Sequence, residues 1–128
     1  MSLNYSVEYL AEKKIIYVSI IGRMDFHSAE KYSKEALLLA QKKKCRKFIF
    51  DHRFTVFHGS SVNFHTSEDE LQQFGFKSSD QIAIILRIQK NGTKLKEETN
   101  RNNTWSILKY FYSKDKLEAI DWLSINNN

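Results

Sequence analysis

The chain has 128 residues, of which 41% are hydrophobic and 27% charged, a balance that is typical of one globular domain and excludes a disordered chain. A single cysteine, Cys45, excludes an internal disulfide framework, and no apolar run approaches the roughly 20 residues of a membrane-spanning helix. The formal net charge of +5 is spread along the chain. Its dense basic run, residues 42–47, falls at an expected helix end where cations are favourable, so we expect no nucleic-acid binding. Residues 1–9 lack the pattern of a signal peptide, and we therefore expect a cytoplasmic protein.

The first two predicted elements are strands. Residues 5–10 alternate, with Tyr5, Val7 and Tyr9 on one face, as is typical of an edge strand. Residues 15–21 are almost continuously apolar and rich in β-branched side chains, as in a strand that is buried on both faces. The short polar segment between them predicts an antiparallel hairpin.

A helix should follow the hairpin. We expect Gly22 to end the second strand and either Asp25 or Ser28 to cap the helix. The helix should end near Lys43. Its apolar residues recur at helical spacing and form one buried face; they are Ala29, Tyr32, Ala36, Leu37 and Ala40.

The middle of the chain is predicted to contain a strand, a loop and a short helix. Residues 47–51 form the strand, and residues 52–66 form a loop rich in aromatic side chains. Ser67 and Glu70 match a capping box that begins the short helix. Gly75 lies where a helix commonly ends in a residue with positive φ.

The last third of the chain continues the alternation of strands and helices. Its predicted elements are a central strand at 81–86, a polar helix at 90–102, a strand at 105–111 and a helix that Ser113 caps. We expect residues 1–4 and 124–128 to fray.

This order of elements predicts one α/β domain over residues 1–128. The sheet should be mixed and mostly parallel, with about five strands, an N-terminal antiparallel hairpin and about four helices. Ligands of such sheets bind beyond the carboxyl ends of the strands. The sequence places three segments there, which are residues 22–25, 51–61 and 87–92.

The segment from Asp51 to Thr66 is the main candidate for a binding site. It combines aromatic side chains with charged and imidazole groups, which suits an apolar ligand or a protein partner. The candidate binding residues are Asp51, His52, Arg53, Phe54, Phe57, His58 and Phe64.

Metal binding and catalysis find little support in this segment. His52, His58 and His65 are six and seven residues apart, whereas zinc motifs hold ligand pairs closer together. Ser60 follows a glycine, but the second glycine of a nucleophile elbow is absent. The chain has only 4 glycines and no glycine-rich phosphate loop. We therefore expect no metal, no cofactor and no enzymatic activity.

Four features of the chain are similar to those of one protein superfamily. They are Gly22 between the second strand and a helix, the strand end Phe50-Asp51-His52, the stretch from Phe74 to Ile84, and Tyr110-Phe111 followed by the helical residues 119–123. With these features the chain resembles the STAS / SpoIIAA-like superfamily, and more closely a group of small bacterial proteins of unassigned function. The resemblance implies a mixed sheet with helices.

The resemblance also implies a regulatory role. In superfamily members that antagonise anti-sigma factors, a serine after the strand-end aspartate is phosphorylated, and the matching residue here is Ser60, with Ser61 beside it. The family pattern is Asp-Ser-Ser-Gly, whereas this chain has Gly59 before and Val62 after the two serines. A phosphate there would add up to about two negative charges beside Arg53. Other members resemble CRAL-TRIO lipid-binding domains, which fits an apolar ligand.

The sequence thus predicts a non-enzymatic regulatory or binding module. It would engage a protein partner or a small apolar ligand through residues 51–66. A phospho-switch at Ser60 and a hydrolase that uses Ser60 are the alternatives. Self-association into a homodimer is left open.

Overall fold

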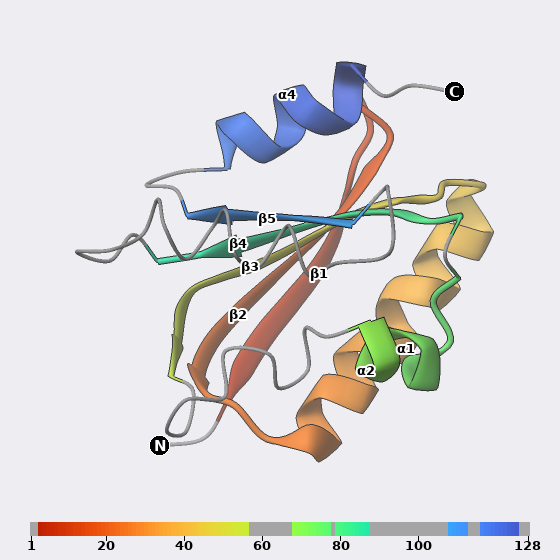
Figure 1. The fold of residues 1–128 in the computed structure, drawn as a ribbon. Coiled ribbons are helices and arrows are strands. Elements are labelled where there is room, and N and C mark those ends of the chain that lie inside the picture. The colour runs from red at the N-terminus through yellow and green to blue at the C-terminus, as the bar shows by residue number, and fades with distance from the viewer. Residues whose placement is uncertain (1–2, 57–67, 78, 88–107, 113–115, 126–128) are drawn as a thin grey trace.

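The fold is a five-stranded mixed sheet with helices on both faces (Figure 1). The computed structural model describes residues 3–56, 68–77, 79–87, 108–112 and 116–125. The strands, in sheet order, are β1 (Asn4–Leu10), β2 (Ile15–Arg23), β3 (Lys47–Val56), β4 (Gln81–Leu86) and β5 (Leu108–Tyr112). The hairpin of β1 and β2 is antiparallel, and each later pairing is parallel. The predicted α/β class and sheet are confirmed.

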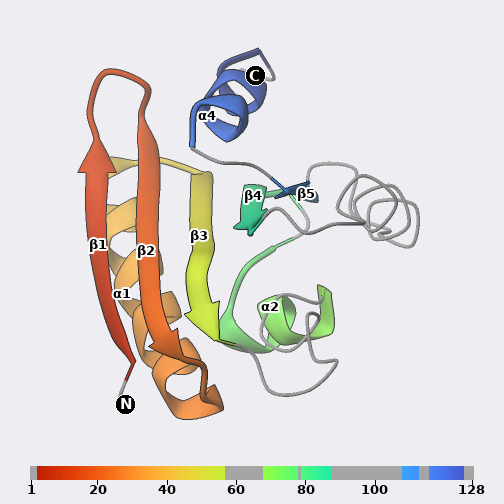
Figure 2. The same ribbon diagram turned by 90° about the vertical axis from the view of Figure 1, so that its left-hand side faces the viewer.

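Two apolar clusters lie on opposite faces of the sheet because side chains alternate along each strand. On one face α1 (Phe26–Lys43) and α2 (Glu68–Phe74) cover residues such as Val18, Phe50 and Ile84. On the other face α4 (Leu117–Ile125) covers residues such as Ile49 and Ile85. α1 lies behind β1 and β2 in Figure 2, and α4 lies near the edge where β2 and β3 begin.

Local chemistry explains both ends of α1. Asp25 is the N-cap, and its carboxylate accepts a hydrogen bond from the Ser28 backbone N–H at 2.7 Å. Lys44 follows the helix in the left-handed conformation, with its N–H directed to the carbonyls of Ala40 and Gln41. Of the two predicted caps, the structure therefore selects Asp25, and it confirms the predicted end at Lys43.

The structure differs from the sequence prediction at the carboxyl ends of β2 and β3. β2 does not end at Gly22 but continues to Arg23, and β3 continues five residues beyond Asp51 to Val56. The two extensions pair with each other, Arg23 opposite Val56. Residues 52–56 are therefore strand and not loop, because the neighbouring strand supplies main-chain partners that local sequence does not reveal.

The remaining predicted elements can be compared only in part. The strand at 81–86 matches β4, and Gly75 has a φ of 112° at the end of α2. α4 continues to Ile125, two residues into the predicted frayed end, and Asn4 belongs to β1. The predicted helix at 90–102 and the predicted caps at Ser67 and Ser113 lie outside the described residues.

Candidate functional site

A β-bulge shapes the carboxyl half of β3. Ser19 pairs with Asp51, but Ile21 pairs with Phe54, so β3 has one more residue than β2 over this stretch. Bulges redirect side chains and are frequent near functional sites. Here the Arg53 guanidinium carbon lies 5.7 Å from the centroid of the Phe54 ring, although the two residues are consecutive.

A polar cluster of Tyr17, Asp51 and Arg53 lies beside the bulge. Asp51 is only 3% exposed, and its carboxylate is fully engaged by these two partners. The Tyr17 hydroxyl donates to Asp51 Oδ2 at 2.5 Å, and Arg53 Nη2 donates to the same oxygen at 2.6 Å. Arg53 also donates to Oδ1 from Nε at 2.9 Å and from its backbone nitrogen at 3.1 Å. A buried carboxylate requires this degree of satisfaction.

The cluster shifts the pKa of each member. Burial alone would raise the pKa of Asp51, but the hydrogen bonds from Arg53 and Tyr17 outweigh burial and hold it below its ordinary value. Burial, with the hydrogen bond to Asp51, raises the pKa of Tyr17 to about 12. The hydrogen bonds to Asp51 raise the pKa of Arg53 further above its ordinary value. At neutral pH the cluster is therefore an ion pair with a neutral tyrosine, which makes Asp51 a poor proton acceptor.

His52 points to the opposite face of the sheet. It is 2% exposed and lies near Tyr32 of α1, with the two ring centroids 6.5 Å apart. Its Nδ1 is 3.1 Å from Thr55 Oγ1, and that hydroxyl donates to the Ile20 carbonyl at 2.8 Å. The hydroxyl proton is thus committed to Ile20, so Thr55 accepts a hydrogen bond from His52. The prediction that His52 lies in a loop is wrong, because the residue belongs to β3 and is buried.

Exposed apolar side chains extend the site toward the carboxyl ends of β2 and β3. Ile21, Phe54 and Val56 are 49%, 55% and 55% exposed. Ile21 is paired with Phe54, so both lie on the sheet face that carries Tyr17. We call these three residues, together with the neighbouring Arg23, Arg53 and Arg87, the carboxyl-end patch.

Arginines border the apolar part of this patch. Arg23 is exposed and pairs with Val56 across the two strands. Arg87 follows β4, and its Nε donates to the Arg53 carbonyl at 3.2 Å. The patch therefore presents guanidinium groups beside apolar side chains.

The structure brings together only some of the predicted site residues. Asp51, Arg53 and Phe54 share one face, whereas His52 lies on the other. Phe57, His58, Ser60, Ser61 and Phe64 lie outside the described residues, so the phospho-switch and the hydrolase stay predictions.

Sequence reasoning missed Tyr17 and Ile21, whereas Arg87 begins the segment 87–92 that was already placed at the carboxyl ends of the strands. The alternation along residues 17–23 was a usable signal, because it places Tyr17, Ile21 and Arg23 on one face. Their proximity to Asp51 depends on strand pairing 34 residues apart, which no local pattern encodes. Among the described residues, no group of three or more histidine, cysteine or acidic residues could hold a metal ion.

Comparisons with known proteins bear on the fold. No protein-family model and no curated protein matches the chain. Among solved structures, the chain is similar to an uncharacterized protein of the DUF3478 family with a SpoIIAA-like fold from Shewanella loihica PV-4, at a TM-score of 0.58 and 12% identity. The similarity covers 95% of this chain and 93% of that one. The chain therefore has a SpoIIAA-like fold, as the sequence resemblance implied.

Within the part of the chain that the structure describes, no helix is long and apolar enough to cross a membrane.

Proposed function

We propose that this protein is a non-enzymatic regulatory module that binds a protein partner through the carboxyl-end patch. The observation that carries the proposal is that half-exposed Ile21, Phe54 and Val56 lie close together on two neighbouring strands, with Ile21 paired to Phe54 and Val56 paired to Arg23. Single exposed apolar residues are ordinary, but neighbouring ones beside arginines are typical of protein interfaces.

The chemistry of the patch favours an acidic, partly apolar partner. Arg23 and Arg87 are exposed at the patch, and the whole chain carries a net charge of +5. Complementary charge steers association and selects partners, while buried aromatic and aliphatic groups supply most of the affinity. The Asp51 ion pair fixes the Arg53 side chain beside the patch, and a side chain that is already ordered loses less entropy on binding.

A non-catalytic role is supported by the state of the titratable groups near the patch. The Asp51 carboxylate, the Tyr17 hydroxyl and the Arg53 guanidinium are hydrogen-bonded to one another. A general acid or base needs a pKa near the working pH and access to its substrate. Asp51 and Tyr17 have pKa values shifted away from neutrality in opposite directions.

Site-specific photo-cross-linking in the cell that naturally makes the protein tests the proposal. A benzophenone amino acid replaces Phe54 in one variant and Leu38, an apolar residue of α1 that is even more exposed, in the control. We expect one protein to cross-link at position 54 and not at position 38.

The cross-linked protein is then identified, purified and titrated against the chain. The double variant Phe54→Ser/Val56→Ser should bind it about tenfold more weakly or worse, because each side chain removes apolar burial. The Leu38→Ser variant should bind like the wild type. Equal cross-linking at both positions, or unchanged binding by the double variant, would contradict the proposal.

A further inference from the structure

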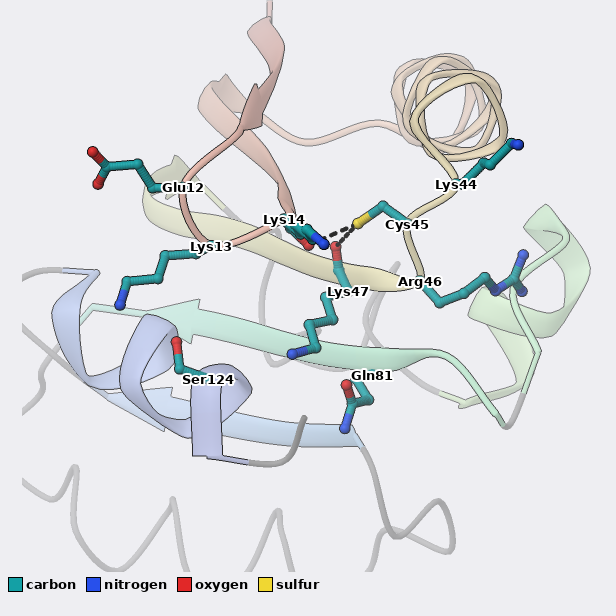
Figure 3. A pocket seen from close by; sticks show the side chains of 9 residues that line it. All are labelled: Glu12, Lys13, Lys14, Lys44, Cys45, Arg46, Lys47, Gln81 and Ser124. Carbon is teal, nitrogen blue, oxygen red and sulfur yellow. Dashed lines mark hydrogen bonds between the residues drawn. The ribbon is translucent and has the colours of Figure 1, made fainter. Parts of the chain in front are cut away.

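A cavity of about 490 Å³ opens at the amino-terminal ends of the parallel strands, at the end of the sheet opposite to the carboxyl-end patch (Figure 3). The turn between β1 and β2, the segment after α1, the starts of β3 and β4 and the last turn of α4 contribute to it. Its charged lining residues are Glu12, Lys13, Lys14, Lys44, Arg46 and Lys47. We call this cavity the amino-end pocket. It plays no part in the proposed partner binding.

The pocket carries a large excess of positive charge. Five of its lining side chains are cationic and only Glu12 is anionic. Arg46 forms an ion pair with Asp80, whose side chain is fully buried, so one cation is locally neutralised. Three positive charges remain in excess. In the described part of the chain, Lys13, Lys14 and Lys44 pair with no carboxylate.

Helix ends account for only part of this charge. Lys47 Nζ donates to the Leu123 carbonyl at 2.9 Å in the last turns of α4, and Lys44 follows α1 directly. Cations at helix carboxyl ends are ordinary, but the effect falls off beyond the last turn. Lys13 and Lys14 belong to the turn between β1 and β2, so the helix dipole does not explain their presence.

Two of these lysines occupy unfavourable backbone conformations. Lys14 and Lys44 have φ values of 56° and 53°, and they are the positive-φ residues other than glycine in the described chain. Glycine or asparagine fits such positions better than a long side chain does. Both lysines line the amino-end pocket. Local backbone preference therefore explains lysine at neither position; the helix end accounts for the charge of Lys44, but no local feature accounts for that of Lys14.

The base of the pocket is held by interactions that do not depend on a ligand. Cys45 is buried, and its thiol donates to the Lys14 carbonyl at 2.9 Å, with the Lys47 carbonyl 3.6 Å away. The Gln81 N–H donates to the Arg46 carbonyl at 3.0 Å. These bonds join the starts of β2, β3 and β4, so the lysines project from a preorganised frame (Figure 3).

We propose that the amino-end pocket binds a small metabolite that carries two or more linked phosphate groups. Lysine ammonium and arginine guanidinium groups are the usual protein ligands of phosphate. Its volume lies within the range of about 300–1,000 Å³ that small-molecule sites occupy. Several phosphates on one compact molecule match the charge excess better than a single carboxylate does.

Calorimetric titration with sodium tripolyphosphate tests the proposal on the full chain. The test variant is Lys14→Asn/Lys44→Gly, and the matched control is Lys31→Gln/Lys34→Gln on the exposed surface of α1. Both variants remove two positive charges. Since each lost charge-assisted bond is worth about tenfold in affinity, the test variant should bind tripolyphosphate at least about tenfold more weakly. The control should change affinity by less than about twofold, because distant charges are screened in physiological salt.

Thermal unfolding separates a lost site from a damaged fold. The melting temperature of Lys14→Asn/Lys44→Gly should equal or exceed that of the wild type, because both replacements suit a positive φ. Amide resonances of the wild type should shift on adding tripolyphosphate at residues 12–14, 44–47 and 81, and not at the carboxyl-end patch.

Four results would overturn the proposal, and three of them concern tripolyphosphate. They are a wild type that shows no saturable binding of tripolyphosphate, equal weakening by the test and control variants, and resonance shifts that lie elsewhere. The fourth result concerns extended polyanions. If single-stranded DNA or an anionic vesicle bound through the same lysines more tightly than tripolyphosphate or ATP does, the ligand would be an extended polyanion and the proposal would be wrong. A negative result in any of these experiments leaves the proposal of partner binding unaffected, because the amino-end pocket and the carboxyl-end patch share no residue.

Discussion

Asp51 is the residue on which the carboxyl half of β3 depends. It is buried, and it accepts hydrogen bonds from Tyr17 and from both the side chain and the backbone of Arg53. Removing one member of a buried ion pair leaves the other charge without compensation, which costs more than the pair itself contributes.

The variant Asp51→Ala should therefore lose about 3–5 kcal/mol of unfolding free energy. Urea denaturation followed by circular dichroism measures this loss. Asp121→Ala, at an exposed position of α4, is the control and should change stability by no more than about 0.5 kcal/mol. A loss of similar size in both variants would show that Asp51 is not buried as described.

The same carboxylate makes stability depend on pH. Its pKa in the folded protein lies below the ordinary value of 3.8, so the folded state favours the charged form. The contribution is fully present above pH 3.8 and is lost as the pH falls through the lower folded pKa. Urea titrations of the wild type and Asp51→Asn between pH 2 and pH 7 should show a stability gap that is constant above about pH 5 and narrows below about pH 4. A gap that widens in acid would reverse the sign and contradict the assignment.

At the scale of elements, α2 depends on a glycine at its end. Gly75 has a φ of 112°, and a Cβ built there would lie 3.1 Å from Leu37 Cδ1 of α1. Backbone strain and the close approach of the two helices therefore act at one position.

The variant Gly75→Ala should lose about 1–2 kcal/mol of stability, because alanine disfavours this φ. Differential scanning calorimetry or urea denaturation measures it. Gln73→Ala, at an exposed site on the same helix, should be close to neutral. A neutral Gly75→Ala would mean that the end of α2 rearranges freely.

Elements with strong local signals could be predicted from the sequence. β4 was found with its correct bounds because it is a continuous apolar run, and α1 because Asp25 caps a clear helical period. The extension of β3 could not be predicted, because Asp51, His52 and Arg53 interrupt the alternation where the bulge lies. Such residues resemble a loop until a partner strand is considered.

The candidate site was predictable only in part, because local sequence does not reveal strand pairing. Asp51, Arg53 and Phe54 are close together in the sequence, so the local pattern was enough to predict them. Tyr17 reaches Asp51 across a parallel strand pair, and the amino-end pocket gathers segments from most of the chain. Such long-range juxtapositions follow from topology and not from spacing.

At the scale of the whole molecule, substitutions in the carboxyl-end patch should weaken partner binding without lowering the stability of the fold. The variant Phe54→Ser/Val56→Ser removes side chains that are more than half exposed. Its melting temperature should therefore stay within about 3 °C of the wild type, as for ordinary surface substitutions. Thermal unfolding checks this, with Phe50→Ser, at a buried position of the same strand, as the destabilised reference. A loss in the patch variant as large as that of Phe50→Ser would place these residues in a core and remove the basis for an interface.

α4 links the two ends of the molecule. Near its end the Leu123 carbonyl accepts a hydrogen bond from Lys47 in the amino-end pocket, and just before its start the Lys116 ammonium lies 4.4 Å from the centroid of the Tyr17 ring. If both proposals hold, an anion bound to Lys47 would compete with the Leu123 carbonyl, and a partner that displaced Tyr17 would change its contact with Lys116. Any coupling between the two sites would then pass through α4, and thermodynamic reciprocity would require that the effect of the anion on partner affinity equal the effect of the partner on anion affinity.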